Sequence, residues 1–179
     1  MKWNTKQIDE ITKVLRGKRL TTKELSDEFV FPVYHGGLIP LGYFSKFNRK
    51  ANTVMIINVG ASAGTVGFSN VDFWSSDGCF CIDKSEFDNK FLYYYLKNNE
   101  CYFQQKVRKA GIPALDSLAV EKFKVPVIEI EEQQRIVSIL DRFDTLCNDI
   151  TQGLPAEIEY RTKQYEYYRD KLLTFKRIN

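Results

Sequence analysis

Residues 124–143 read KVPVIEIEEQQRIVSILDRF, and this stretch decides how the chain is organised. Its first part is a short β-branched run interrupted by Pro126, which is compatible with neither a helix nor a central strand. Apolar residues then return at positions 136, 139, 140 and 143, which is the spacing of one helix face. Glu131 and Glu132 fall in the first turn, where negative charge interacts favourably with the helix dipole. The chain therefore turns here from a mixed globular body into a long helix.

The bulk composition is that of a folded protein without a membrane segment. The chain has 179 residues, of which 44% are apolar and 14% aromatic, and this allows one packed domain with an appendage. It contains no run of about 18 apolar residues, and its N-terminus lacks the apolar core of a signal peptide. We therefore expect a cytoplasmic protein that does not bind membranes.

The cysteines and the histidine do not form a metal-binding pattern. Cys79 and Cys81 are two residues apart, whereas Cys101, Cys147 and the single histidine, His35, are isolated. Zinc sites use more widely spaced Cys pairs or clusters of Cys and His. We therefore interpret the cysteines as small buried side chains, and we predict neither a metal nor a cofactor.

The net charge of +3 is unevenly distributed along the chain. Residues 130–179 hold 8 Lys and Arg against 9 Asp and Glu, whereas residues 1–129 hold 18 against 14. The basic excess belongs to the globular part. It agrees with nucleic-acid binding, but many domains with other functions carry as much.

Two segments of the globular part have the pattern of β-strands. Residues 29–34 form an apolar run that contains Pro32, which predicts an edge strand. Residues 52–59 are almost continuously apolar, which predicts a central strand buried on both faces. The glycine-rich residues 60–67 follow it without the Gly-Lys-Ser/Thr ending of a phosphate-binding loop and without a helical pattern. We therefore predict a tight hairpin there.

Helical spacing occurs at further places in the globular part. Residues 5–14 predict a short helix, and a basic loop around Gly17 follows, which is either solvated surface or a phosphate contact. Residues 89–107 predict a helix with a broad apolar face. Asp116 predicts the cap of a single helical turn before a strand at residues 122–128.

From residue 131 onward the apolar side chains follow a heptad-like rhythm, which also passes through Cys147. An extra residue in this rhythm falls at residues 153–155, where the proline that follows the glycine should kink or break the helix. A long helix with a narrow apolar seam needs a partner, unless the arm folds back on its own domain. The residues expected at this seam are Ile136, Leu140, Phe143, Ile150, Ile158, Tyr165, Tyr168, Leu172 and Phe175.

Several segments in order carry a resemblance to a known family. They are Val125-Pro126-Val127, Glu132-Gln133, Arg135-Ile136, Leu140-Asp141-Arg142-Phe143 and residues 153–175. Together they resemble the junction between a target-recognition domain and a helical spacer in the specificity subunits of type I restriction-modification enzymes.

The resemblance implies an α+β protein with two parts. Residues 1–129 would form a mixed α/β target-recognition domain that binds double-stranded DNA. Residues 130–179 would form a long, kinked helical spacer that pairs antiparallel with a partner helix. The spacer would also dock the methyltransferase subunits, which modify adenine, and through them the restriction subunits. With one domain and one arm, the chain resembles half of such a subunit, and a homodimer formed through the arms would rebuild the missing symmetry.

Three groups of residues are candidates to face DNA. The loop at residues 43–50 interleaves aromatic and basic residues, which suits phosphate and base contacts but also a surface loop with buried Phe44 and Phe47. A segment at residues 74–77 is similar to an aromatic-then-polar segment of the family, and is otherwise a structural turn. A basic cluster ends the helix at residues 89–107, where it serves either DNA or the helix dipole. The candidates are Lys46, Asn48, Arg49, Lys50, Trp74, Ser76, Lys106, Arg108 and Lys109.

The chain lacks the motifs of the enzymes in such a system. Its five prolines are never adjacent, so the Asn/Asp-Pro-Pro-Tyr/Phe loop of an adenine methyltransferase is missing. Asp116 and Glu121-Lys122 lack the spacing of a common nuclease site. We therefore predict a non-catalytic subunit without catalytic residues. The alternative is a coiled-coil adaptor whose globular domain binds protein, and a stand-alone enzyme is disfavoured.

Overall fold

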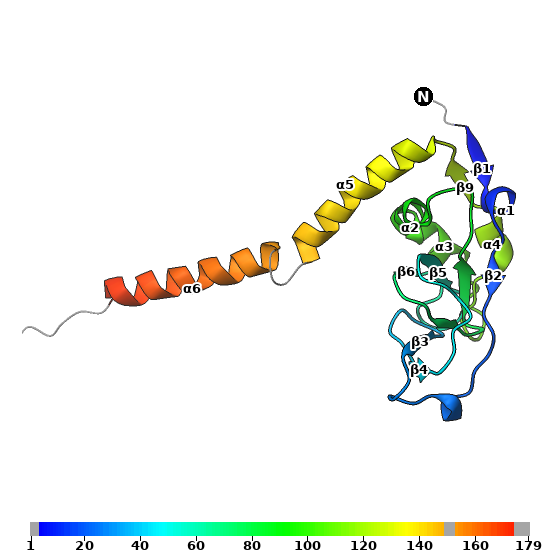
Figure 1. The fold of residues 1–179 in the computed structure, drawn as a ribbon, viewed down its shortest axis with the longest axis horizontal. Coiled ribbons are helices and arrows are strands. Elements are labelled where there is room, and N and C mark those ends of the chain that lie inside the picture. The colour runs from blue at the N-terminus through cyan, green and yellow to red at the C-terminus, as the bar shows by residue number, and fades with distance from the viewer. Residues whose placement is uncertain (1–3, 149–152, 174–179) are drawn as a thin grey trace, which may run out of the picture. The chain divides into compact units, whose positions relative to one another are not determined.

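The computed structural model describes residues 4–148 and 153–173 (Figure 1). The chain divides into two compact units, Met1–Gln134 and Arg135–Asn179, which we call unit 1 and unit 2. Unit 1 mixes strands and short helices, whereas the described part of unit 2 is helical. The α+β class predicted from the sequence is therefore confirmed.

A four-stranded sheet forms the centre of unit 1. Its strands are β2 (Leu15–Arg16), β8 (Cys79–Ile82), β5 (Thr53–Ile57) and β6 (Val66–Ser69), in this order. Every residue of β5 is buried, because the strand has an antiparallel neighbour on each side and α2 covers it. The prediction of a buried central strand is thus confirmed.

The glycine-rich segment after β5 is the hairpin that leads into β6. The Gly64 N–H donates to the Ile57 carbonyl at 2.8 Å, which closes the turn. Gly64 has a φ of +89°, and a Cβ at this position would lie 2.8 Å from the backbone nitrogen of Gln104. Glycine is needed here because of both its backbone conformation and this close approach. The predicted hairpin is confirmed.

A second sheet has the strand order β4 (Gly42–Phe44), β3 (Phe31–Tyr34) and β7 (Trp74–Ser75). The expectation of an edge strand at Pro32 is therefore wrong, since β3 is the central strand. A proline is tolerated in this central strand because β7 pairs only with Val33 and Tyr34. Pro32 therefore has a neighbouring strand on one side only, as it would in an edge strand.

The N-terminal segment contains less helix than its sequence pattern predicts. Its first residues form β1 (Thr5–Gln7), which pairs with β9 (Lys124–Pro126) in a two-stranded sheet. Only α1 (Ile8–Ile11) is helical, and Thr12 is already extended. The predicted helix at residues 5–14 is confirmed only over Ile8–Ile11, because the pairing of residues 5–7 with β9 overrides the local helical spacing. A short 3-10 turn, η1 (Thr22–Glu24), follows β2.

Three helices complete the core of unit 1. The first, α2 (Asn89–Asn98), is capped by the Asp88 side chain and packs on β5 and β6. A break at Asn99 separates it from α3 (Glu100–Lys106), so the expected single helix is two. Asp116 caps α4 (Ser117–Glu121), as predicted. The Phe103 ring lies 5.0 Å from the Phe123 ring and joins α3 to the segment before β9.

The long helix α5 (Ile130–Asn148) begins in unit 1. The Gln133 side chain is only 2% exposed. Its Nε2 donates to the Ile128 carbonyl and its Oε1 accepts from the Asp88 N–H, both at 2.9 Å. The first turn of α5 is thereby joined to the N-terminus of α2.

Unit 2 continues α5 and contains α6 (Leu154–Leu173), which has no buried residue. The two helices have 19 and 20 residues. Two expected seam residues, Ile150 and Phe175, lie outside the described residues. Of the segment where we expected a kink or break, Gly153 precedes α6, and Leu154 and Pro155 are its first two residues. The kink itself stays a prediction. The antiparallel pairing of the spacer stays a prediction. Within the described ranges, no helix is long and apolar enough to cross a membrane.

Candidate nucleic-acid interface

The predicted residues at positions 48, 74 and 76 meet in one network of hydrogen bonds. The Asn48 amide donates to the Ser75 carbonyl at 2.9 Å and accepts from the Ser75 N–H at 2.7 Å. The Trp74 indole donates to the Lys18 carbonyl at 2.8 Å, and its ring packs against Phe44. Ser76 is 2% exposed. These polar groups hold the loop at residues 45–50 to β7.

Arg49 extends this network to the segment around Gly17. Its guanidinium donates to the Asn48 carbonyl at 2.8 Å and to the Arg16 carbonyl at 3.0 Å. A Cβ on Gly17 would lie 1.9 Å from the Ser76 carbonyl oxygen, so that no side chain fits there. The close contact places two exposed cations, Lys18 and Arg19, directly beside β7.

Two lysines of the same loop keep their charge in solvent. Lys46 is exposed, and the side chain of Lys50 has 72% of its area exposed. The Lys50 ammonium lies 4.5 Å from the centre of the Phe47 ring and 3.4 Å from an Asp72 oxygen. Because an exposed ion pair of this kind contributes little to stability, this cation is available to a phosphate.

The third predicted group lies on a short loop with a rigid base. Arg108 and Ala114 exchange backbone hydrogen bonds of 2.9 and 3.1 Å, and the Gly60 N–H donates to the Pro113 carbonyl at 2.9 Å. The loop is thus fastened to the residues that follow β5. Lys106, Arg108 and Lys109 are exposed, and Gly111 has a φ of +79° at the tip.

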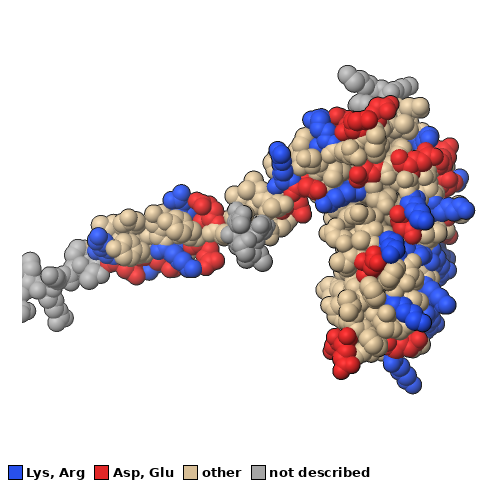
Figure 2. Space-filling model, viewed as in Figure 1, with Lys and Arg blue, Asp and Glu red and all other residues tan. Residues whose placement is uncertain are grey.

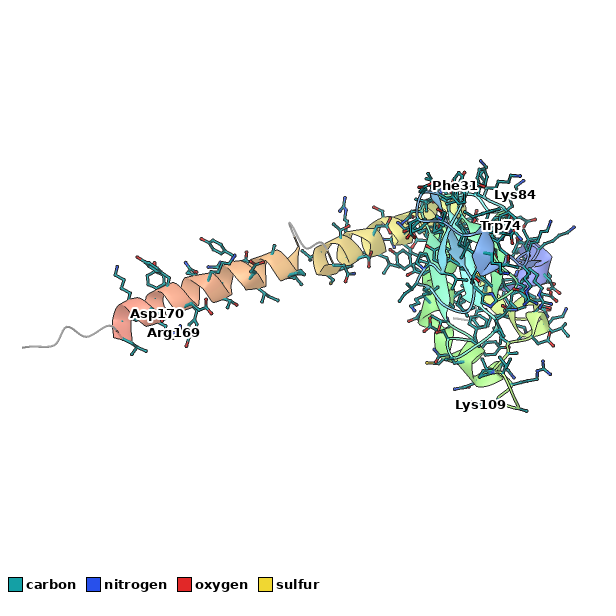
Figure 3. The ribbon with its side chains drawn as sticks, turned by 90° about the horizontal axis from the view of Figure 1, so that it is seen from below. Phe31, Trp74, Lys84, Lys109, Arg169 and Asp170 are labelled. Carbon is teal, nitrogen blue, oxygen red and sulfur yellow. The ribbon has the colours of Figure 1, made fainter. Side chains whose placement is uncertain are left out.

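The structure does not bring the predicted residues into a single cluster. Lys109 and Trp74 lie at opposite ends of unit 1 (Figure 3). The segment around Gly17 connects the two groups, because the Arg16 carbonyl accepts from Arg49 while Arg16 also lines a hollow with Arg108. Lys and Arg side chains gather along the side of unit 1 on which α1 and β2 lie (Figure 2). The candidate interface is therefore spread over unit 1 and is not a single pocket.

Two polar hollows border Arg16. One has a volume of about 480 Å³ and is lined by Arg19, His35 and Asp77, among others. The other, of about 350 Å³, is lined by Asn58 and Arg108, among others. Three buried side-chain atoms in the described part of the chain have no hydrogen-bond partner: His35 Nδ1, Arg49 Nε and Asn58 Oδ1. His35 Nδ1 lies 3.4 Å from an Asp77 oxygen, at the limit of a weak contact.

Arg16, His35 and Asn58 are not among the candidates that the sequence predicts. The sequence indicates a possible phosphate contact for the basic residues around Gly17, but no local pattern places them beside β7 or Arg108. The one signal at Asn58 was an amide at the end of an otherwise apolar strand. The structure contains no group of three or more His, Cys, Asp and Glu side chains within the described residues that would hold a metal ion.

The expected seam of unit 2 exposes large apolar side chains. On α6, the exposed fractions of Ile158, Tyr165 and Leu172 are 65, 66 and 74%. Tyr168 is also exposed, and so is Phe143 on α5, whereas Ile136 and Leu140 are half-buried. Such a helix surface is unusual without a partner.

The chain thus combines a mixed α+β unit that carries basic loops with a helical region. The family model for the type I restriction modification DNA specificity domain matches residues 1–160. The chain belongs to this family, as its junction at residues 124–143 led us to expect.

Individual relatives agree with the family. A putative type I specificity subunit from Mycoplasma pneumoniae is 34% identical over 97% of this chain and 58% of its own length. The specificity subunit of the Escherichia coli type I restriction enzyme EcoR124I/EcoR124II is 50% identical over 48% of this chain and 22% of its own length. The chain therefore spans less than two thirds of these relatives.

The fold is also found among solved structures. The S subunit of the type I restriction-modification system from M. genitalium matches with a TM-score of 0.75 and 24% identity, over 96% of this chain and 46% of that one. The HsdS subunit from Thermoanaerobacter tengcongensis matches with a TM-score of 0.61 and 20% identity, over 80% of this chain and 37% of that one. At this level of identity the likeness concerns the fold.

Proposed function

We propose that this chain gives a type I restriction-modification system its DNA sequence specificity by reading one half-site of a bipartite target. The observation that carries the proposal is the family match over residues 1–160. The basic side of unit 1 supports it, because Lys and Arg side chains on rigid loops can neutralise the phosphates of a DNA backbone. Catalysis would reside in the methyltransferase and restriction subunits that the chain positions.

The candidate DNA contacts divide into two roles. Lys46, Lys50, Lys106, Arg108 and Lys109 are exposed and would neutralise phosphates or reach bases. Asn48, Arg49, Trp74 and Ser76 have polar groups engaged in the fold, or are buried, and would hold the loops in place. Under this division, the first group determines the affinity for DNA, and the second determines the folding stability of unit 1.

The helices of unit 2 would form the spacer that fixes the distance between two half-sites. We propose that α5 and α6 form a kinked arm that pairs antiparallel with a second arm, from another copy or from a second repeat. The exposed apolar side chains of α6 support this pairing. A matched pair of recognition units at fixed spacing would read two half-sites, as dimeric DNA-binding proteins do. The arm would also dock the modification subunits.

Two arginine substitutions test the division of roles. Arg108→Ala should weaken binding of duplex DNA by the chain assembled with its modification subunits, and should reduce the slope of log affinity against log salt by about 1. Arg49→Ala should chiefly lower the thermal stability of unit 1, since it removes two bonds to backbone carbonyls. An unchanged affinity and salt slope for Arg108→Ala would remove this residue from the interface.

Sequence selectivity itself is tested in cells. Methylome sequencing of a strain that expresses the chain with its modification subunits should show one bipartite adenine-methylation motif. A twofold-symmetric motif would indicate a homodimer. DNA binding that ignores base changes at the half-sites would refute the proposed function and would favour an adaptor.

A further inference from the structure

Asn58 occupies an unusual place for an amide. It directly follows β5 and is only 5% exposed. Both of its backbone polar groups are hydrogen-bonded, because its N–H donates to the Gly78 carbonyl at 3.1 Å and its carbonyl accepts from the Leu115 N–H at 2.8 Å. The side-chain oxygen has no partner. The backbone pairing would be served equally well by an apolar side chain.

An unpartnered buried amide has a cost that calls for an explanation. Leaving one buried polar group unsatisfied costs about 1–3 kcal/mol, and such groups in native structures often have a functional role. The two residues before Asn58 are buried isoleucines, so that the local sequence favours an apolar side chain. A ligand that completes the hydrogen bonds of the amide would account for its presence.

Asn58 lines the hollow of about 350 Å³ at the base of the Arg108 loop, which we call the Asn58 hollow. Its volume falls in the range of small-ligand sites. The charged residues of its lining are Arg16, Arg108, Asp116 and Glu121, two of each sign. A phosphate-binding site would carry a net positive charge, whereas this lining offers hydrogen-bond donors from the arginines and acceptors from the carboxylates.

A nucleobase has this mixed character, because its edge presents donors and acceptors together. An Asn amide matches adenine in particular, since its oxygen accepts from the N6 amino group while its nitrogen donates to N7. The Asn58 oxygen is covered in the unliganded protein. A half-turn about χ2, which is a soft two-fold torsion, would exchange the amide oxygen and nitrogen and move the oxygen out of its covered position, so that it could accept from an N6 amino group in the hollow.

We propose that the Asn58 hollow receives the edge of one adenine of the DNA target and that Asn58 is the residue that reads it. The inference rests on the proposed function, since it assigns one base position to a chain that binds a DNA half-site. It adds a specificity-determining residue outside the loops at residues 43–50 and 74–77.

The test uses the full chain assembled with its modification subunits and a library of duplexes with randomised half-sites. Asn58→Leu keeps the size of the side chain but removes its polar atoms. We expect one adenine position to lose its preference in the selected sequences. Affinity for the best wild-type duplex should fall by about 5- to 150-fold, while the midpoint of thermal unfolding stays equal or rises.

Asn70→Leu is the matched control, because Asn70 is exposed and lies outside the hollow. This variant should select the same sequences as the wild type. If Asn58→Leu keeps every base preference, the inference is wrong while the proposed function stands. If the wild type itself selects no sequence, the proposed function fails first.

A second variant keeps the test decisive if Asn58→Leu folds poorly. Glu121→Gln replaces a carboxylate of the lining of the hollow with a neutral amide of the same shape. It should change the preference at the position read by Asn58 or at its neighbour. A folded Glu121→Gln variant with unaltered preferences would overturn the inference.

Discussion

The glycines of unit 1 differ in what a side chain would meet. Gly64 has a positive φ and touches the backbone of α3, Gly111 has a positive φ in open space, and Gly37 has neither constraint. Replacing each of these glycines with alanine therefore separates the free-energy cost of backbone strain from the cost of steric overlap.

We predict that Gly64→Ala is the most destabilising of the three substitutions. Strain at positive φ contributes about 1–2 kcal/mol, and overlap with the Gln104 backbone adds about 1–3 kcal/mol. Gly111→Ala should cost the strain alone. Gly37→Ala should be neutral or stabilise by up to about 1 kcal/mol through the unfolded chain.

The measurement is urea unfolding of the full chain followed by tryptophan fluorescence. Trp74 lies on β7 of unit 1, so that its signal reports on this unit. If Gly64→Ala were no less stable than Gly111→Ala, the close contact between the hairpin and α3 would be contradicted.

At the scale of single residues, the sequence identifies the side chains that can bind DNA better than it identifies the contacts that each of them makes. The mixture of Asn, Arg and Lys at residues 46–50 predicts nucleic-acid contacts, and nothing local distinguishes the members. The structure shows that Asn48 and Arg49 donate to backbone carbonyls of β7 and β2, whereas Lys46 and Lys50 remain exposed. The difference arises from partners about 30 residues away in the chain, which no local pattern encodes.

Among the elements, the first turn of α5 is joined to the N-terminus of α2 by the buried side chain of Gln133. Gln133→Ala would leave the Asp88 N–H and the Ile128 carbonyl without their partner. We predict a loss of about 1–3 kcal/mol in the free energy of unfolding of unit 1, measured by the same fluorescence assay. The matched control is Gln134→Ala, because Gln134 is exposed on the same helix.

The control should change stability by no more than about 0.5 kcal/mol. Equal stabilities of the two variants would show that Gln133 does not fasten α5. A further readout follows from the proposed function: if the root of the arm sets the spacing of half-sites, Gln133→Ala should relax the spacer length accepted in the methylation motif.

The elements that the sequence predicts well are those whose burial is uniform. All five residues of β5 are buried, and a short, almost continuously apolar and β-branched run favours a strand with both faces covered. The N-terminal segment is the opposite case, since Ile8 and Ile11 are buried at helical spacing but their neighbours pair with β9. A strand partner about 120 residues away decides the outcome there, and periodicity carries no record of it.

For the whole molecule, the family resemblance predicts the division into a globular and a helical part. The hollows and the unpartnered side-chain oxygen of Asn58 are seen only in the structure. Residues from four separate segments line the Asn58 hollow. Such an assembly depends on tertiary packing, so that only an amide at the end of an apolar strand hinted at it.

The pairing of the spacer can be tested through the cysteines of the chain. Cys101 and Cys147 are exposed, whereas Cys79 and Cys81 are buried. The hydrogen bond with Cys81, together with burial, raises the pKa of the Cys79 thiol well above its usual range. An alkylating reagent should modify the exposed Cys101 and Cys147 in the folded chain and leave Cys79 and Cys81 unmodified, because both of these are buried. In Cys79 the raised pKa also disfavours the thiolate, which is the reactive form.

Cys147 follows Phe143 in the apolar rhythm of α5 and would be covered when the arm pairs. We predict that its alkylation slows as the chain associates with a second copy or with modification subunits, in proportion to the fraction that remains unpaired. Alkylation of Cys101, on α3, should keep its rate and serves as the control in the same sample. Mass spectrometry of peptides across a concentration series measures both rates. If Cys147 reacted equally fast in the assembled complex and in the dilute chain, the apolar seam would not be the surface through which the arm finds its partner.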